Sequence, residues 1–380
     1  MTNMKGFDCR FVEPDDAFDL MRLYQGSIPR IKSDALFLDL ARLRGEIETN
    51  GRYWAVAAAK GQLVALVALQ HDAENRLGRV RRMYAAGPEA EKREALSVAL
   101  SFLMERITSE GSTDLIYSTT RTLTLEQQDL ALEQGFKVLG VFPNAVHADP
   151  RRLNGLSAWY APDVLTKRRH AEFSLHPVVE PFFEIVRKQC DLPKQGTAKV
   201  PAPPEGLEPC PPLEMVEAPR FVAERYRQVK ARKNLSVNYF PFETPNILFT
   251  SPDGKVEVFV RLVKQTRFAC ILGEHITGAV DPVRLYRDVA AALYASRVIY
   301  IEVINDAADV QSTECILRAG FVPCGYLPCL KPAGDKRRDY VVFARSYEYF
   351  TYPRLKVNSL YLDYLREYCK ARAAMSTRDA

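Results

Sequence analysis

Hydrophobic and polar positions along the chain predict an alternation of strands and helices. A short apolar run at 9–12 precedes Pro14, and the acidic residues after that proline mark the start of a helix. A second helical pattern runs over 34–49. Three apolar runs then occupy 53–86, separated first by a Lys-Gly pair and then by the polar segment His-Asp-Ala-Glu-Asn. Runs with such polar breaks are typical of an antiparallel meander.

The pattern then changes to alternating helices and strands. Residues 88–107 carry apolar side chains at helical spacing, which predicts one buried face, made of Ala95, Val98, Ala99, Phe102, Leu103 and Ile107. Further elements follow in the order strand, helix, strand, at 114–120, 125–134 and 136–142. Gly135 ends the helix at the position where a left-handed residue is favoured. One more strand within 151–162 and an appended helix at 176–189 complete this part.

The second part of the chain repeats this order. After a first helix, three apolar runs are followed by helix, strand, helix, strand, strand and a last helix; the predicted elements are 220–231, 246–250, 255–263, 267–276, 281–296, 298–304, 309–319, 321–327, 338–348 and 358–373.

A short motif marks the repeat. Gly135-Phe136 and Gly320-Phe321 each precede a further glycine four places after the phenylalanine and a proline three places later. The two phenylalanines are separated by 321 − 136 = 185 residues, with no gap across the motif. We interpret the chain as two tandem copies of one α/β unit.

A proline-rich linker separates the copies. Prolines concentrate within 192–212, where they remove backbone donors and disfavour helix and central strand. We therefore predict an N-terminal domain with its appended helix at 1–192, a linker at 193–212 and a C-terminal domain with its appended helix at 213–380. The 380-residue length is consistent with two domains.

Composition narrows the function classes. The formal net charge of +5 is mildly basic, and it favours an anionic ligand slightly while disfavouring nucleic acid. The eight cysteines form no C-x-x-C pair and the five histidines are scattered, which argues against a metal site or a disulfide framework. No apolar run has spanning length, and the start has no signal-like apolar region. We expect a cytoplasmic protein without a membrane segment.

The element order, ending in helix, Gly-Phe and strand, resembles the GNAT family of acyl-coenzyme A-dependent N-acyltransferases. The resemblance covers about residues 7–160 and 213–347. It implies two tandem GNAT-like folds of the α/β (α+β) class, each a mixed, mostly antiparallel sheet flanked by helices. It also implies an acyl-coenzyme A co-substrate, most simply acetyl-coenzyme A, no metal, and a small-molecule or protein amine as acceptor.

The resemblance places the cofactor diphosphate where the fourth strand meets the third helix. In the first copy this is the segment from Met83 through Ala85 and Gly87 to Lys92 and Arg93, which offers an open turn and positive charge. Arg93 would stand at the family's Arg/Gln position. The glycines of the family's motif are absent, however, because leucine and valine stand at 96 and 98.

The second copy has no recognisable version of this motif. Gly273 and Gly278 are present, but no cation precedes Arg284 at the helix entry, and Glu274 and Asp281 would repel phosphate. We therefore expect the first copy to bind the cofactor and the second to shape the acceptor site or stabilise the fold.

Three residues are candidates for proton transfer. The family often carries a general-acid tyrosine five residues before the phenylalanine, and Ala131 and Ile316 stand there instead. Glu302, a carboxylate in an apolar strand, is a candidate base. Gapless transfer of the repeat places Tyr117 at the corresponding point, and Tyr84 ends the presumed fourth strand as a proton-donor candidate.

These observations leave three hypotheses open. The first is an N-acyltransferase in which a neutral amine attacks the thioester directly within a ternary complex. The second is a tandem GNAT-like protein that binds a ligand or partner without catalysis, which the missing glycines and tyrosines favour. The third is an aminoacyl-tRNA-dependent peptidyl transferase, against which the modest charge counts. The oligomeric state is not predicted by the sequence.

Overall fold

The computed structural model describes residues 2–4, 6–27, 34–120, 125–143, 153–202, 204–232, 235, 242–348 and 358–376. The chain forms two compact units. Unit 1 comprises Met1–Thr119, Glu126–Phe136 and Ala158–Pro162, and unit 2 comprises Thr120–Leu125, Lys137–Ser157 and Asp163–Ala380. Unit 2 thus includes strands that the sequence assigns to the first repeat. The predicted domain boundary at the linker, 193–212, concerns the sequence repeats, and it remains a prediction.

Unit 1 is built on a sheet whose strands follow the chain in order, β1-β2-β3-β4-β5-β6. All neighbours are antiparallel except β5 and β6, which are parallel because α3 crosses between them. The strands are β1 Thr2–Met4, β2 Phe7–Phe11, β3 Trp54–Ala59, β4 Gln62–Asp72, β5 Leu77–Ala85 and β6 Leu115–Thr120. The helices are η1 Pro14–Asp16, α1 Ala17–Ser27, η2 Ala35–Leu38, α2 Leu40–Asn50, η3 Gly51–Tyr53, α3 Glu89–Glu110 and α4 Leu125–Glu133.

The predicted helix over 34–49 is divided in the structure. Asp34 caps the short η2 by accepting the Leu36 amide, and Asp39 caps α2 by accepting the Arg42 amide at 3.0 Å. An aspartate side chain that binds its own backbone competes with helix continuation, which explains the break at Asp39. The predicted meander and the buried face of α3 are confirmed, except that Phe102 is only partly buried.

Unit 2 contains a sheet of order β8-β7-β16-β17-β15-β14-β13-β12-β11. Its strands are β7 Lys137–Pro143, β8 Leu153–Tyr160 (whose end belongs to unit 1), β9 Ser174–Leu175, β10 Gly196–Thr197, β11 Glu214–Val216, β12 Ile247–Thr250, β13 Val256–Val263, β14 Phe268–Ile276, β15 Tyr300–Asp306, β16 Val322–Ala333 and β17 Lys336–Ser346; β9 and β10 pair separately. Its helices are α5 Val164–Lys167, α6 Glu180–Cys190, α7 Pro219–Ala231, η4 Lys264–Thr266, α8 Pro282–Ala295, α9 Val310–Arg318 and α10 Ser359–Ser376. The mixed α/β architecture is the predicted one.

The strand ladders of the two predicted repeats have several features in common. The parallel ladder starts at Leu77↔Leu115 in one repeat and at Phe268↔Tyr300 in the other. Each fourth strand also carries a bulge, which leaves Arg81 and Leu272 as extra residues. The third parallel pair is Arg79↔Tyr117 in one repeat and Cys270↔Glu302 in the other, so Tyr117 and Glu302 are equivalent.

The repeated glycines make two different contacts. Gly135 and Gly320 have positive φ (80° and 87°) and end their helices, as predicted. Gly140 and Gly325, the later glycines of the motif, lie opposite each other in the antiparallel pairing of β7 with β16. A Cβ added at Gly140 would lie 2.5 Å from the Gly325 Cα and 2.7 Å from the Cys324 carbonyl oxygen. A residue with a side chain at position 140 would therefore clash with the backbone of β16.

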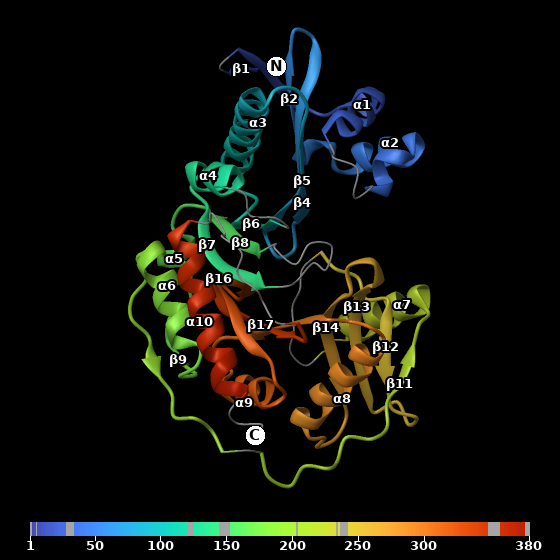
Figure 1. The fold of residues 1–380 in the computed structure, drawn as a ribbon, viewed down its shortest axis with the longest axis vertical. Coiled ribbons are helices and arrows are strands. Elements are labelled where there is room, and N and C mark those ends of the chain that lie inside the picture. The colour runs from blue at the N-terminus through green and yellow to red at the C-terminus, as the bar shows by residue number, and fades with distance from the viewer. Residues whose placement is uncertain are drawn as a thin grey trace. The chain divides into compact units, whose positions relative to one another are not determined.

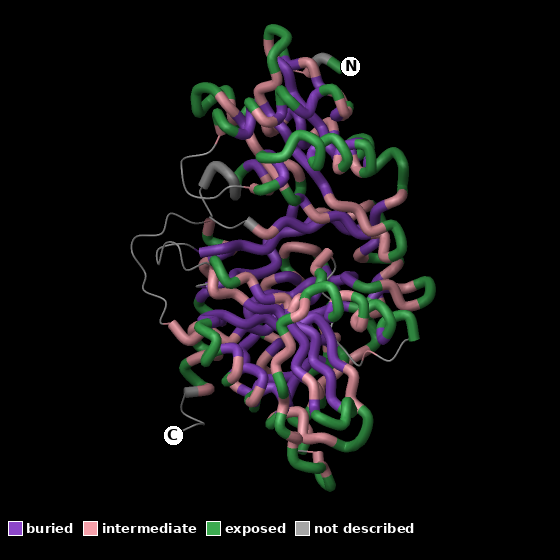
Figure 2. The backbone as a smooth tube through the Cα atoms, turned by 90° about the vertical axis from the view of Figure 1, so that its right-hand side faces the viewer, coloured by how far each residue is buried: buried purple, intermediate pink, exposed green. Residues whose placement is uncertain are grey.

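Two helices cover this β7–β16 contact. Figure 1 shows α6 and α10 beside these strands, and both helices contact both strands. The Tyr364 hydroxyl of α10 donates to the Val138 carbonyl at 3.3 Å, and the Gln189 side chain of α6 accepts the Val138 amide at 3.0 Å. Tyr361, Tyr364 and Tyr368 of α10 are all buried. Long buried stretches of backbone are visible in Figure 2, and nearly all of β15 and β16 is buried.

We predict that Gly140→Ala lowers the free energy of unfolding by about 3 kcal/mol, because a methyl group cannot fit against the Gly325 backbone without separating the strands. Urea unfolding of the full chain measures this. Gly45→Ala in α2 is the control: nothing lies within 4 Å of an added Cβ there, and a helical alanine should stabilise by about 0.5–1 kcal/mol. Equal effects of the two substitutions would contradict the assigned contact.

Candidate functional site

Both repeats contain a pair of parallel strands that separate toward their carboxyl ends. The ladder between β5 and β6 stops at Val80↔Ser118, so that Met83 and Ala85 lie on β5 beyond it. In the second repeat the ladder between β14 and β15 stops at Cys270↔Glu302. Beyond these points the two parallel strands of each pair are no longer paired with each other. The divergence occurs in both repeats and does not by itself distinguish them.

The turns that follow the fourth strands share one glycine conformation. Gly87 has φ 111° and Gly278 has φ 112°, and both lie just before the helix that crosses to the next strand. The spacing 278 − 87 = 191 is the same as that between the bulges at Arg81 and Leu272. A non-glycine residue would be strained here. The sequence prediction that Gly87 forms an open turn fits this conformation.

The first turn of α3 has no side-chain cap. Pro88 stands at the N-cap position, and the first amide bonded within the helix is that of Lys92, which donates to the Pro88 carbonyl at 2.9 Å. The amides of Glu89, Ala90 and Glu91 precede it. Unbonded first-turn amides and the positive end of the helix dipole favour an anion.

The first turn of α8 binds two groups of the chain itself, the Asp281 side chain and the backbone of Glu208. The Asp281 carboxylate accepts the Val283 amide at 2.9 Å, which places a negative charge on the helix N-terminus. In addition, residue Glu208 of the linker lies alongside this turn. Its amide donates to the Ala279 carbonyl at 2.6 Å, and its carbonyl accepts the Asp281 amide at 3.0 Å. The linker therefore occupies the turn of the second repeat that corresponds to the open turn of the first.

Lys92 and Arg93 both have carboxylate partners. Lys92 pairs with Glu89 at 3.3 Å, and Arg93 pairs with Glu133 at 2.5 Å. Both pairs are solvent-accessible and contribute little to stability, so an anion could draw the cations away at low cost. Leu96 lies in the interior of α3, where its amide belongs to the helix. A diphosphate bound at this helix would consequently meet the first-turn amides and not those around position 96.

Tyr84 belongs to a polar and aromatic cluster of unit 1 that the sequence did not reveal. Arg82 donates to the Asp34 carboxylate at 2.7 Å, and the Tyr84 hydroxyl donates to the same oxygen at 3.4 Å. The Tyr24 hydroxyl accepts the Asp34 amide. The ring of Phe37 lies 4.8 Å from that of Tyr24 and 5.3 Å from that of Tyr84. Asp34 thereby ties the segment before α2 to the end of β5.

The pKa of Asp34 is lowered in this cluster and the pKa of Tyr84 is raised. Burial would raise the pKa of Asp34, but the hydrogen bond and positive charge of Arg82 outweigh it, and that pKa is lowered. Burial raises the pKa of Tyr84 well above its usual value, and the negative charge of Asp34 raises it further. At neutral pH Asp34 is a carboxylate and Tyr84 a neutral phenol that donates to it.

The three predicted catalytic residues do not form one cluster within either unit. Tyr84 and Tyr117 lie on β5 and β6 of unit 1, and Glu302 lies on β15 of unit 2. Tyr117 is buried, with the Arg79 guanidinium 5.8 Å from its ring centre. Glu302 is buried too. Burial raises the pKa values of Tyr300 and Cys324, and the negative charge of Glu302 raises both further.

Glu274 is a buried carboxyl group in the second repeat, which the sequence marked only as repulsive to phosphate. It lies on β14 beyond the parallel ladder, at the position equivalent to Met83. Burial raises the pKa of Glu274 to about 7, and a hydrogen bond with Tyr286 of α8 opposes this increase. Glu274 therefore titrates near neutral pH, unlike an ordinary glutamate.

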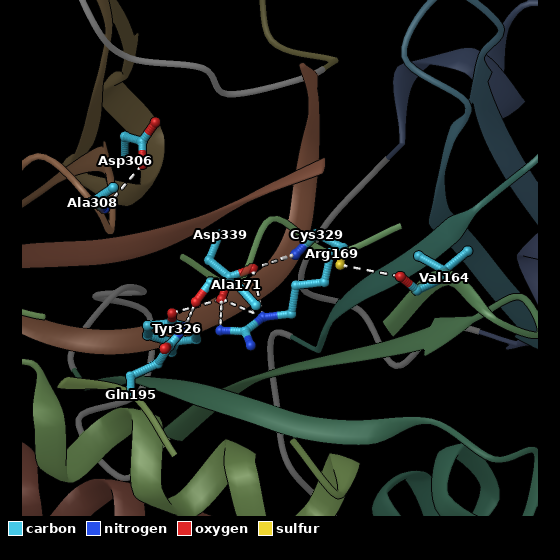
Figure 3. A network of polar contacts seen from close by, with 9 residues as sticks. All are labelled: Val164, Arg169, Ala171, Gln195, Asp306, Ala308, Tyr326, Cys329 and Asp339. Carbon is cyan, nitrogen blue, oxygen red and sulfur yellow. Dashed lines mark hydrogen bonds and ion pairs between the residues drawn. The ribbon is translucent and has the colours of Figure 1, made fainter. Parts of the chain in front are cut away.

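A buried ion pair lies in unit 2, between Arg169 and Asp339. Arg169 donates to Asp339 at 2.6 and 2.9 Å, and both side chains are at most 1% exposed. Figure 3 shows Tyr326 and Cys329 converging on Asp339, the tyrosine hydroxyl donating at 2.7 Å and the cysteine amide at 3.0 Å. Cys329 has φ 55° within a bulge of β16. The arrangement is a structural tie that fixes this bulge.

The described part of the chain gives two further observations on chemistry. No group of three or more His, Cys, Asp or Glu side chains there has the arrangement of a metal site. All eight cysteines are free, and burial raises the pKa of Cys190 to about 12, so this thiol is not activated at neutral pH.

Hydropathy gives a separate observation. None of the described helices is both long and apolar enough to span a bilayer.

Comparison with solved structures finds GNAT-family proteins. A GNAT-family acetyltransferase from Streptococcus pneumoniae matches at a TM-score of 0.36 and 16% identity, over 41% of this chain and 99% of its own. A ribosomal-protein-alanine N-acetyltransferase from Brucella melitensis matches at 0.35 and 16%, over 40% and 99%. A GNAT-like decarboxylase in complex with isobutyryl-CoA matches at 0.33 and 12%, over 40% and 98%. Similarity at these TM-scores establishes neither activity nor ligand.

No protein-family model matches the sequence, and no curated protein matches it.

We predict that Glu274 makes the folded chain less stable as the pH rises from about 4.5 to 7. The folded state keeps the proton longer than the unfolded state does, so raising the pH favours unfolding by about 3 kcal/mol over this window. Glu274→Gln should remove this decrease and be more stable than the parent at pH 8. Urea unfolding at both ends of the window measures it, with the exposed Glu205→Gln as control. Identical pH slopes in parent and Glu274→Gln would refute the assignment.

We also predict that Asp339→Ala destabilises the chain by about 3–5 kcal/mol, because it leaves the Arg169 guanidinium buried without its counter-charge. The exposed Asp335→Ala, in the adjacent turn, should change the free energy of unfolding by less than about 0.5 kcal/mol. Chemical denaturation of both variants tests this, and a mild effect of Asp339→Ala would show that the pair is not a structural tie.

Proposed function

We propose that the chain is an acyl-coenzyme A-dependent N-acyltransferase and that its first repeat binds the cofactor. The observation that carries the proposal is the difference between the two turns: the first turn of α3 has no side-chain cap, whereas that of α8 is occupied by Asp281 and the linker. The order of elements, which resembles the GNAT family in both repeats, supplies the reaction class. One cofactor per chain follows from this difference.

The cofactor diphosphate would lie against the amides at the start of α3. Gly87 brings the backbone around from β5 without a side chain, and Lys92 and Arg93 follow within the next turn of helix. The glutamates at 89 and 91 are the opposing feature, because both place negative charge in this first turn. Binding would therefore require Lys92 and Arg93 to exchange their glutamate partners for phosphate oxygens.

Within this proposal Tyr84 is the general acid that protonates the leaving sulfur. It stands at the end of β5 beyond the parallel ladder, and Asp34 fixes the direction of its hydroxyl. Transfer would proceed by direct attack of a neutral amine on the thioester carbon, with the electron pair of the broken C–S bond going to sulfur and the proton on sulfur coming from Tyr84. The proton that the attacking nitrogen loses would pass to solvent, from which Tyr84 would regain its own. The raised pKa of Tyr84 opposes this donation, because a phenol whose pKa lies well above that of a thiol is the weaker acid of the two.

Tyr117 and Glu302 have different places in this proposal. Tyr117 lies within the parallel ladder and is buried, so it would support the cofactor-binding strands. Glu302 belongs to the repeat whose turn is closed, and we assign it no part in the transfer. The acceptor would be a small-molecule or protein amine.

A non-catalytic role is the second candidate function. Ala131 and Ile316, where the family often has its tyrosine, accept the Phe136 and Phe321 amides at 3.0 and 3.3 Å through their carbonyl groups. Their backbone thus completes the helix ends, while their side chains offer no proton. A chain that binds acyl-coenzyme A without transferring the acyl group would fit this observation.

Isothermal titration of the full chain with acetyl-coenzyme A tests the proposal. We expect one site per chain, and Lys92→Ala/Arg93→Ala should weaken binding about tenfold through the loss of charge-assisted bonds to phosphate. Arg284→Ala/Arg287→Ala, which changes the corresponding helix α8, is the matched control and should leave the affinity unchanged.

Each other result has a distinct meaning. No binding by the intact chain would refute the function, and an unchanged affinity of the Lys92→Ala/Arg93→Ala variant would refute the placement on α3. Two sites per chain would show that the second repeat is open. Binding without thiol release in the presence of amines would favour the non-catalytic candidate.

A further inference from the structure

An exposed aromatic ring lies on unit 2 at the end of α8. Tyr294, in the last turn of this helix, is 53% exposed. Its ring stacks on that of Tyr347, which directly follows β17, with 4.2 Å between the ring centres and 24° between the ring planes. Tyr347 thus covers one face of the Tyr294 ring, and the large exposure of Tyr294 leaves the other face to solvent.

Tyr347 is fixed by contacts of its own. Its hydroxyl donates to the Ala290 carbonyl of α8 at 3.0 Å, and its amide donates to the Ile299 carbonyl at 2.9 Å. The Arg345 guanidinium lies 5.2 Å from the centre of its ring. Because Tyr294 stacks on this fixed ring, it loses little further freedom when a planar ligand covers its open face.

The stack distinguishes Tyr294 from the other exposed large apolar side chains. Those of the described residues are Phe18, Leu38, Leu40, Val200 and Phe221. Within the described part of the chain, Tyr294 is the one of these exposed side chains that stacks on another ring. Its open face is therefore an ordered planar surface and not a single mobile side chain.

Two arginines lie beside this end of α8. The Arg297 amide donates to the Tyr294 carbonyl at 2.8 Å, and Arg297 is exposed. The Arg267 guanidinium donates to the Arg297 carbonyl at 2.7 Å. Glu348 is the opposing group, because its carboxylate lies 3.7 Å from the Arg267 guanidinium. A ligand that combines a planar ring with an anionic group would suit the exposed ring and the exposed arginine that follows it.

We propose that Tyr294 is a stacking site for the base of a small nucleotide, whose phosphate is directed to Arg297. Every nucleobase has a π-face, and stacking of a base on an aromatic side chain is a substantial part of its binding. A guanidinium is a favourable donor to phosphate oxygens. Proteins that bind single-stranded nucleic acid stack successive bases along a charged groove, whereas the described residues offer one exposed ring here, which favours a single nucleotide.

This inference does not depend on acyl transfer, and its test is separate. Titration of the full chain with AMP should give a saturable site, and adenosine should bind the same site more weakly because it has no phosphate. Added salt should weaken AMP binding and leave adenosine binding nearly unchanged. The Lys92→Ala/Arg93→Ala variant should bind AMP as the parent does, which separates this site from the proposed cofactor site on α3.

The decisive variant is Tyr294→Ala, which should weaken the binding of AMP and adenosine about tenfold through the loss of stacking. Tyr294→Trp should retain the binding of both, because it keeps a planar face. Arg297→Gln should weaken the binding of AMP alone. The matched control is Phe221→Ala, which removes a ring that is 57% exposed on α7 and should leave binding unchanged. Thermal unfolding of each variant without ligand checks that the fold is intact.

Four results would overturn the proposal. They are no saturable binding of AMP or adenosine, equal affinities of the parent and Tyr294→Ala, loss of AMP binding in Lys92→Ala/Arg93→Ala, and tight binding of a short single-stranded oligonucleotide that AMP does not displace. The third would place the nucleotide on α3, and the fourth would indicate a nucleic-acid surface. Equal weakening of AMP and adenosine by Arg297→Gln would contradict the place assigned to the phosphate.

Discussion

The contact between Gly140 and Gly325 is the constraint on which the arrangement of unit 2 depends. The two glycines occupy the same place in the repeated motif, and they face each other where β7 pairs with β16. Because the added Cβ would lie within 2.5 Å of the opposite backbone, no other residue fits at Gly140. This close approach allows strands from both repeats to share one sheet, over which α6 and α10 then pack. The repeats are therefore joined by strand pairing in addition to the linker.

The sequence predicts the elements well because their determinants are local. Period-2 and period-3.6 patterns gave the meander of unit 1 and the later helices, and Gly135 marks a helix end through its positive φ. The division of the 34–49 helix was missed because two aspartate caps compete with a continuous apolar pattern. The repeated motif marks Gly140, but its own backbone does not explain the glycine: its φ is not positive, and the reason lies in the close approach of the opposite strand.

The candidate site was predicted less completely, since its parts are distant in sequence. Asp34 and Arg82 meet across the fold of unit 1, and Arg169 meets Asp339 from 170 residues away. Sequence alone suggests solvated loops for the latter pair, because charges in basic clusters are usually exposed. An aspartate directly before the apolar run of β17 is the one local hint that Asp339 is buried. The open turn at Gly87, by contrast, could be predicted, as it depends on a few consecutive residues.

The two repeats show how one backbone can support different chemistry. Gly87 and Gly278 have the same conformation, and the strands before them separate in the same way, so the turn itself has been retained in both copies. The two copies differ in the groups that accept hydrogen bonds from the amides of the turn. At α8 the Asp281 side chain accepts the Val283 amide and the Glu208 carbonyl accepts the Asp281 amide. At α3 no side chain caps the helix. An amide that already has an internal partner gains nothing from a phosphate, whereas an uncapped one does. The closed turn of the second repeat thus fixes the end of the linker, and the equivalent turn of the first repeat is left for a ligand.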